Sequence, residues 1–324
     1  MSIKASLIIC TKDRAKQLEK CLNSLIKSYE TNLDVEVVLV DNGSTDETPK
    51  IIQQFKNTSP WQIVNVIAGK AGLGYARNYG IKASSGEVLI FTDDDCYLEE
   101  KFFSKFFAVF NPQQHQFGGG SIILFNQDDD SRVANMLVQD KVTLPPYTTV
   151  IPAGQIQGAN MFFMRKVFEK AGYFDENLGA GTNFPCEDIE MACRASQHGF
   201  TGAVIPGFNV FHDHGRKTNS IEAERTVKSY DVGRGAYYGV LLSRGVREAW
   251  EFWGERTAFE NLTRAQLEQL QLELSGAASY LEFALKKPNW QPEKHKEKLP
   301  FIDYLVKIMR LIKKTVKRIS IINQ

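Results

Sequence analysis

Short apolar runs alternate with segments of helical periodicity over the first 110 residues. Each run is nearly continuous in apolar residues, which is typical of strands buried on both faces of a parallel sheet. The runs are residues 6–10, 35–40, 63–67 and 87–92, and the helical segments between them are 18–26, 51–55 and 73–83. The alternation predicts an α/β fold, with a doubly wound, mostly parallel sheet and helices on both faces.

Beyond residue 115 the pattern is less regular. Gly118–Gly120 precede a predicted strand at 121–125, residues 126–130 are expected to form a surface loop, and prolines make 140–155 irregular. A further strand (159–164), a short helix (165–171) and a longer helix (187–198) follow, and a last strand-like run lies at 208–211.

From about residue 220 the chain is predicted to be mostly helical, with a long helix at 264–285. We therefore expect a domain at 1–240, with halves 1–110 and 111–240, and a helical C-terminal region at 241–324. Pro288–Pro292 are expected to form a linker into the last helix.

The last predicted helix, residues 301–319, is amphipathic and basic. Its apolar stripe consists of Ile302, Leu305, Ile308, Met309, Ile312, Val316 and Ile319, and its cations are Lys307, Arg310, Lys313, Lys314, Lys317 and Arg318. Such a helix can lie on an anionic membrane surface, or it can pack on the folded domain with its cations in solvent. The sequence leaves both interpretations open.

Charge and cysteine content narrow the class of protein. The net charge of +1 combines a basic tail with a mildly acidic body, so we expect no nucleic-acid partner. Five cysteines without a C-x-x-C pair favour a reducing compartment. Because no signal-peptide pattern and no apolar run of about 18 residues are found, we expect a cytoplasmic protein, at most associated with the inner face of the membrane.

Three consecutive acids, Asp93, Asp94 and Asp95, follow the predicted strand at 87–92. Alternate residues of an extended segment point the same way, so Asp93 and Asp95 are expected to share one side. Two carboxylates at the carboxyl end of a strand are suited to Mg²⁺ or Mn²⁺. The alternative is a solvated acidic turn.

Polar residues also follow the second strand and open the third helix. Asp41 is placed to accept a hydrogen bond from a base or ribose. The alternative for this loop is that Ser44 or Thr45 caps the next helix. Arg77, in a helix that opens at Gly72–Gly74, is suited to a diphosphate. The alternative for Arg77 is a surface position.

Glu187 and Asp188 open the helix at 187–198. Acids in a first helical turn are favoured by the helix dipole, and either of them could also act as a general base. His212 and His214 follow the strand-like run at 208–211 and are candidate metal ligands.

In their order along the chain, these segments resemble family 2 inverting glycosyltransferases with the nucleotide-sugar-binding GT-A type fold. The resemblance covers roughly residues 3–240 and is carried by 6–14, 40–46, 76–81, 83–95, 172–179, 187–194 and His212. Lys12-Asp13 replace the usual His-Asn, so contacts from that loop are expected to differ. The Gln-x-x-Arg-Trp signature of processive synthases is absent, which favours transfer of single sugars.

The resemblance implies a role for each position. Residues expected to bind the nucleotide sugar are Thr11, Arg14, Asp41, Ser44, Arg77, Asp93 and Asp94. Expected ligands of Mn²⁺ or Mg²⁺ are Asp95, Asp93 and His212. Asp188 is the expected catalytic base, and Glu187 is the second candidate for that role. The two halves of 1–240 would then bind the donor and the acceptor.

The implied reaction is a direct displacement that inverts the sugar. The donor would be a UDP-sugar and the acceptor a glycan or a lipid-linked sugar, with peripheral membrane contact through 301–319. Two alternatives stay open: a catalytically silent nucleotide- or glycan-binding module, and a nucleotidyltransferase that forms sugar nucleotides.

Overall fold

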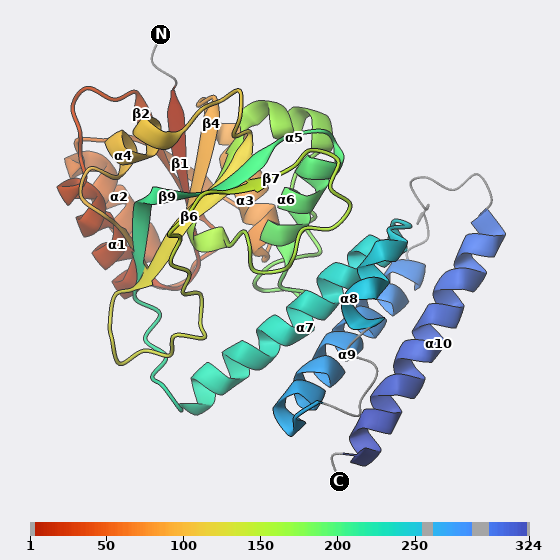
Figure 1. Cartoon of the computed structure of the whole chain (residues 1–324). Helices are drawn as coiled ribbons and strands as arrows, with labels where there is room; N and C mark the ends of the chain where they lie inside the picture. Colours follow the sequence, from red (N-terminus) through yellow and green to blue (C-terminus); the bar gives the residue numbers. More distant parts are fainter. Residues whose placement is uncertain (1–3, 255–261, 287–297, 323–324) are drawn as a thin grey trace. The chain divides into compact units, whose positions relative to one another are not determined.

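The computed structural model describes residues 4–254, 262–286 and 298–322. The chain forms two compact units (Figure 1), which we call the sheet unit (Met1–Thr182 and Glu187–Ala223) and the helical unit (Asn183–Cys186 and Glu224–Gln324). The boundary expected at residue 240 lies inside helix α7 (Ile221–Ser243). The linker expected at Pro288–Pro292 lies outside the described residues.

Nine strands of the described residues form one mixed sheet in the order β3-β2-β1-β4-β8-β6-β9-β5, with β7 paired to β9. The first four of this order are mutually parallel, whereas β8 is antiparallel to both β4 and β6. The strands are β1 (Ala5–Thr11), β2 (Val35–Asp41), β3 (Gln62–Ile67), β4 (Val88–Asp93), β5 (Cys96–Leu98), β6 (Phe117–Leu124), β7 (Val142–Leu144), β8 (Met161–Met164) and β9 (Gly202–His212).

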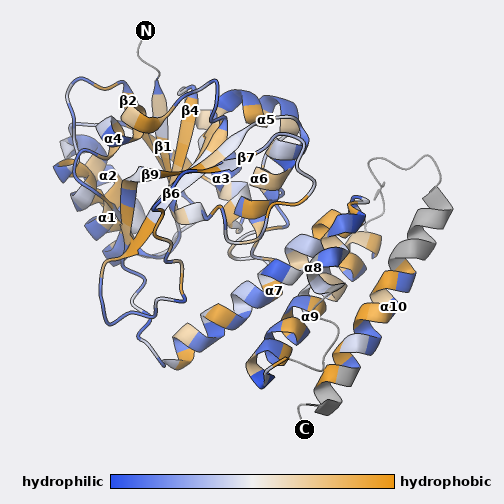
Figure 2. Cartoon of the chain, in the orientation of Figure 1, coloured by the Kyte–Doolittle hydropathy of each residue, from blue (hydrophilic) through white to orange (hydrophobic). Residues whose placement is uncertain are grey.

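Helices cover both faces of this sheet. One side carries α1 (Ala15–Lys27), α2 (Thr48–Thr58) and α4 (Phe102–Val109), and the other carries α3 (Leu73–Ala83), α5 (Arg165–Ala171) and α6 (Glu187–Gln197) (Figure 1). The strands between them are mainly hydrophobic (Figure 2), since they are buried from both sides. The predicted α/β fold and the helical C-terminal region are confirmed.

Two local predictions were correct only in part. The glycines expected before a strand lie inside β6, where a Cβ at Gly118 would come within 1.9 Å of the Ala203 carbonyl oxygen on β9. The expected surface loop at 126–130 contains two buried acids, Asp129 and Asp130, each 2% exposed. Asp129 is buried because it accepts the Gly215 N–H at 2.9 Å and pairs with Lys217.

The parallel register determines where the polar loops meet. Thr11 lies beside Asp41, and Cys10 lies beside Asp93. The carboxyl ends of β1, β2 and β4 therefore share one edge, where ligands bind in sheets of this kind.

The helical unit is built from α7, the short η2 (Arg247–Trp250) and α8 (Glu251–Gly254), and the long α9 (Arg264–Lys286) and α10 (Lys298–Ile322). The backbones of α7 and α9 approach closely, because a Cβ added at Gly235 would come within 1.7 Å of the Glu273 carbonyl oxygen. The buried Glu273 side chain accepts hydrogen bonds from Arg234 at 2.8 Å and from the Trp253 indole at 3.0 Å.

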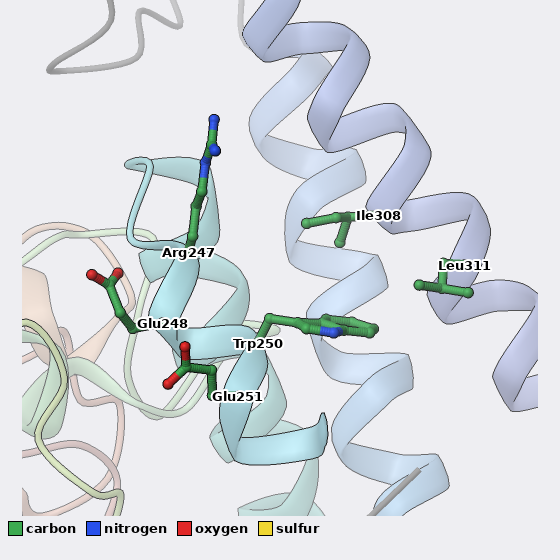
Figure 3. A pocket seen from close by; sticks show the side chains of 6 residues that line it. All are labelled: Arg247, Glu248, Trp250, Glu251, Ile308 and Leu311. Atoms are coloured by element: carbon green, nitrogen blue, oxygen red, sulfur yellow. The ribbon is translucent and has the colours of Figure 1, made fainter. Parts of the chain in front are cut away.

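Helix α10 packs against α9, and its buried side chains include Ile308, Ile312 and Ile319. The Trp250 side chain points toward α10 beside an open groove of about 490 Å³ (Figure 3). Its lining consists of Arg247, Glu248, Trp250, Glu251, Ile308 and Leu311. Among the described residues, no helix combines the length and the apolar character that a membrane span requires.

Substituting Gly235→Ala is expected to lower the free energy of unfolding by about 1–3 kcal/mol, because the new methyl group overpacks the contact between α7 and α9. Urea denaturation of the full chain measures the loss. Gly69→Ala is the matched control, since a Cβ there meets nothing within 4 Å. Equal stability of the two variants would contradict the close approach.

Candidate active site

The three acids at the end of β4 lie in a turn. The strand ends at Asp93, the chain turns at Asp94 and Asp95, and β5 begins at Cys96. The expectation of an extended segment through Asp95 is therefore wrong. As a result the three carboxylates have different partners, and each is considered separately below.

Asp95 and His212 form the part of the site best suited to a metal ion. The His212 Nε2 lies 3.3 Å from Asp95 Oδ1, and its Nδ1 lies 3.2 Å from the Ala134 carbonyl oxygen. Because a carbonyl only accepts, Nδ1 carries the proton, which leaves Nε2 free to ligate when the ring is neutral. Burial opposes protonation of His212, but the hydrogen bond to Asp95 raises its pKa above the ordinary value.

His214 is less suited to ligate a metal. Its Nδ1 accepts the Arg216 N–H at 3.0 Å, so in the neutral ring Nε2 carries the proton. This Nε2 is buried and has no hydrogen-bond partner among the described residues. Of the two histidines, the geometry favours His212.

Cys96 completes a cluster of three possible ligand atoms with Asp95 and His212, all within 4.8 Å of one another. Burial raises the pKa of the Cys96 thiol well above its ordinary value, so the thiol stays protonated. Hard cations prefer oxygen ligands, so Asp95 is the residue of this cluster best suited to Mg²⁺ or Mn²⁺, and the imidazole of His212 is a better second ligand than the protonated thiol. Among the described residues, the Asp93 carboxylate does not belong to this cluster.

Asp94 is bound by the end of β1 and by the loop that follows it. Thr11 donates its hydroxyl to Asp94 at 2.6 Å, and Arg14 Nε donates to the other oxygen at 2.8 Å. Arg14 Nη2 also reaches Asp95 at 2.5 Å. Burial raises the pKa of Asp94 to about 6, although Arg14 and Thr11 act in the opposite direction. Thr11 and Arg14, expected to contact the nucleotide, are thus bonded to the acidic turn.

Arg77 is a buried counter-ion. Its side chain is 3% exposed, with Nη1 2.5 Å from Glu187 Oε1 and Nη2 3.6 Å from Asp93 Oδ1. A Cβ at Gly158 would come within 2.4 Å of Nη2, so only glycine leaves room there. Burial raises the pKa of Glu187 to about 7, although Arg77 favours the charged form. The alternative of a surface position for Arg77 is wrong.

Asp188 differs from its buried neighbour Glu187. It is partly exposed and accepts N–H groups from Gly158 at 2.9 Å and from Ile189 at 2.7 Å. These bonds orient the carboxylate at the start of α6. A partly exposed, oriented carboxylate next to a buried ion pair is a geometry suited to proton abstraction.

The loop after β2 is tied to the loop after β1. Asp41 Oδ1 accepts the Ser44 N–H at 2.8 Å, and the Ser44 hydroxyl accepts the Asp13 N–H at 2.9 Å. The alternative that Ser44 or Thr45 caps α2 is wrong: the helix begins at Thr48, whose N–H bonds to Asp46 at 2.9 Å. The Asp41 loop therefore belongs to the edge where the acidic turn lies.

Two contributors were not predicted from the sequence. Gly158 provides an N–H to Asp188 and space for Arg77, and the Ala134 carbonyl fixes the His212 ring. Both act through the backbone and come from segments far away in the chain. No local pattern of side chains marks them.

Comparison with known proteins decides the family. The sequence model of glycosyl transferase family 2 matches residues 6–172. The chain belongs to glycosyl transferase family 2. Glycosyltransferase AglE of Haloferax volcanii is 26% identical over 203 residues, which cover 60% of this chain and 62% of AglE.

A second relative acts on poly(ribitol-phosphate), according to its name. Poly(ribitol-phosphate) beta-N-acetylglucosaminyltransferase TarS of Staphylococcus aureus is 32% identical over 99 residues, or 31% of this chain and 17% of TarS. The chain thus covers less than two thirds of the length of either relative.

Solved glycosyltransferase structures share the fold. The mannosyltransferase PcManGT from Pyrobaculum calidifontis, in complex with GDP-Man and Mn²⁺, has a TM-score of 0.54 at 17% identity, over 100% of this chain and 87% of the other. TarS residues 1–349 in complex with UDP have a TM-score of 0.53 at 17% identity, over 99% and 92%. This similarity confirms the predicted GT-A type fold.

Replacing Arg77 with Met is expected to reduce the free energy of unfolding by about 3–5 kcal/mol, since Glu187 would be buried without its counter-ion. The loss should be larger at pH 8 than at pH 5.5. Below its raised pKa Glu187 is mostly protonated and needs no cation, whereas at higher pH it must be buried charged.

Urea denaturation at the two pH values measures this effect. Lys50→Met, which removes an exposed partner of Glu47, is the control and should change stability little at either pH. A loss for Arg77→Met that does not depend on pH would contradict the role assigned to the Arg77–Glu187 pair.

Proposed function

We propose that this chain transfers a single sugar from a nucleotide diphosphate donor to an acceptor hydroxyl, with inversion at the sugar. Family membership and the names of its relatives support sugar transfer. The observation that carries the proposal is the placement of Asp188, a partly exposed carboxylate on the sheet edge that also holds the Asp95–His212 pair.

The donor is a UDP-sugar in this proposal. The nucleotide would bind between the loops after β1 and β2, where Asp41, Ser44 and Asp13 are linked by hydrogen bonds. TarS has been solved with UDP and with UDP-GlcNAc, which supports uridine, whereas PcManGT has been solved with GDP-Man. A guanosine donor is therefore the second nucleotide to test.

Mn²⁺ or Mg²⁺ would be held by Asp95 and His212, with Asp93 joining if it leaves Arg77. Such an ion, when bound, neutralises charge on the leaving diphosphate. The protein's own part is electrostatic and geometric. Arg77 keeps Glu187 and Asp93 in place, and this ion pair forms the buried wall beside Asp188.

Asp188 is the general base in this mechanism. One of its oxygens takes the proton of the acceptor hydroxyl while the acceptor oxygen attacks the anomeric carbon from the face opposite the diphosphate. The bond from that carbon to the diphosphate breaks in the same step, so the configuration is inverted. The N–H groups of Gly158 and Ile189 hold the carboxylate for this transfer.

Asp188→Asn is expected to lower turnover about 10²–10³-fold, because an amide cannot take the proton. UDP affinity should stay within about twofold, since the amide oxygen still accepts the Gly158 N–H. Release of UDP from a panel of UDP-sugars measures turnover, and calorimetry measures affinity. Glu169→Gln, on the exposed surface of α5, is the control.

Full turnover of Asp188→Asn would rule out this residue as the base. A binding module would be favoured instead if the unmodified chain bound UDP without any sugar transfer. A nucleotidyltransferase would be favoured if the chain released pyrophosphate from a nucleotide triphosphate and a sugar phosphate.

We also propose that α10 brings the protein to an anionic membrane surface, where lipid-linked acceptors are found. Since α10 packs against α9 and Ile308, Ile312 and Ile319 of its apolar stripe are buried, the contact would be electrostatic. The opposite face of α10 exposes Lys307, Arg310, Lys314 and Lys317. Each cation near such a surface contributes about 1 kcal/mol.

Changing these four cations to Gln is expected to weaken vesicle binding roughly 1,000-fold, since four contributions of about 1 kcal/mol are lost. Co-flotation with vesicles of phosphatidylcholine, with and without phosphatidylglycerol, measures the effect. Four matched substitutions on α1 and α2 (Lys16, Lys20, Lys50 and Lys56 to Gln) control for net charge. Equal flotation of both variants, or binding to neutral vesicles, would contradict the proposal.

A further inference from the structure

We propose that Arg14 is an internal counter-ion that occupies the Asp94–Asp95 carboxylates until a divalent cation and the donor diphosphate take its place. This inference rests on the proposed function, because it concerns Asp95, the carboxylate that is proposed there to hold the metal ion. It assigns Arg14 a role in the order of binding, which goes beyond contact with the nucleotide.

The contacts of Arg14 use oxygens that a metal would need. Its Nη2 lies 2.5 Å from Asp95 Oδ2, while His212 lies 3.3 Å from Asp95 Oδ1. Both oxygens of Asp95 therefore face a nitrogen that carries or shares a positive charge. Asp94 is engaged in the same way, by Arg14 Nε at 2.8 Å and the Thr11 hydroxyl at 2.6 Å.

Electrostatics explains why a cation must be present here. Asp94 and Asp95 are 6% and 7% exposed and adjacent in the chain, and two neighbouring buried carboxylates repel each other strongly. Arg77 is already paired with Glu187, so it does not neutralise this pair. Arg14 reaches both carboxylates with one guanidinium and offsets the repulsion.

The same positive charge opposes a metal ion. A divalent cation at Asp95 would lie close to the guanidinium, where like charges repel strongly even at an effective dielectric constant of about 20. Metal binding is therefore favourable only if the Arg14 side chain moves away or if an anion arrives with the metal.

The structure permits the side chain to move while its backbone stays fixed. The Arg14 N–H donates to the Thr48 hydroxyl at 3.2 Å, and its carbonyl accepts the Leu18 N–H at 2.9 Å in the first turn of α1. The side chain itself is 35% exposed. The loop after β2 lies alongside, so a released guanidinium would face the donor, whose diphosphate is a suitable ligand for it.

This arrangement couples the two ligands. A metal ion alone must displace Arg14 while offering the guanidinium no new anion, so it should bind weakly. A metal ion together with the diphosphate supplies both a cation for Asp95 and an anion for Arg14. By linkage, each ligand then raises the affinity for the other.

The test is the affinity for Mn²⁺ alone, measured from the electron paramagnetic resonance signal of free Mn²⁺ and repeated with saturating UDP. Arg14→Met should bind Mn²⁺ about tenfold more tightly than the unmodified chain without UDP, and UDP should enhance its Mn²⁺ affinity less. Arg14→Lys, which keeps the charge, should behave like the unmodified chain in the absence of UDP.

Lys20→Met is the matched control, because it removes an exposed charge that pairs with Asp213, next to His212, and does not touch Asp94 or Asp95. It should change the affinity for Mn²⁺ less than threefold. Thermal unfolding checks that each variant is folded. If Arg14→Met does not fold, Arg14→Gln is used in the same titration.

The counter-ion role would be overturned if a folded Arg14→Met or Arg14→Gln variant bound Mn²⁺ as weakly as the unmodified chain or more weakly. The proposed function would remain intact in that case, provided that the unmodified chain binds Mn²⁺ with UDP. If the unmodified chain binds no Mn²⁺ even with UDP, the metal-dependent function fails, and the counter-ion role fails with it.

Discussion

The candidate site depends on how buried negative charge is balanced at the carboxyl edge of the sheet. Asp93, Asp94, Asp95, Glu187 and Asp188 all lie there, and each of them is in contact with Arg14, Arg77 or the Gly158 backbone. Arg77 is the central partner, because it is almost fully buried and joins the end of β4 to the start of α6. Without Arg77, the buried Glu187 could not keep its charge at that edge.

Charge balance also separates the roles of neighbouring acids. Glu187 and Asp188 are adjacent in the chain, yet the first is committed to Arg77 and the second is held by backbone N–H groups with one side toward solvent. In the same way Asp94 is bonded only to Thr11 and Arg14 among the contacts described above, while Asp95 shares Arg14 and also faces His212. One acid of each pair is thus committed to structural contacts, and the other, Asp188 or Asp95, is the one that we propose takes part in the chemistry.

Much of the fold could be predicted from the sequence because the parallel strands are buried on both faces. The continuous apolar runs that became β1, β2 and β4 have no other stable place, and helix α3 spans the predicted residues 73–83. The position of the site follows from the same pattern, since parallel strands bring their carboxyl ends to one edge.

The contacts within the site could not be predicted, since they are made between distant segments. The turn at Asp94–Asp95 depends on Arg14 and Thr11, some 80 residues earlier, and the burial of Asp129 depends on Gly215 and Lys217. The burial of Arg77 depends on Gly158, where the absence of a side chain provides the space. Local patterns contain none of this information.

The central claim is that Asp95 links a divalent cation to nucleotide binding at this edge. Calorimetric titration of UDP into the protein, with Mn²⁺ and then with excess chelator, tests it most directly when repeated with Asp95→Ala. The account predicts UDP binding that requires both Mn²⁺ and Asp95, with GDP as the comparison nucleotide. Binding of equal strength in chelator or in Asp95→Ala, or no binding of either nucleotide under any condition, would contradict it.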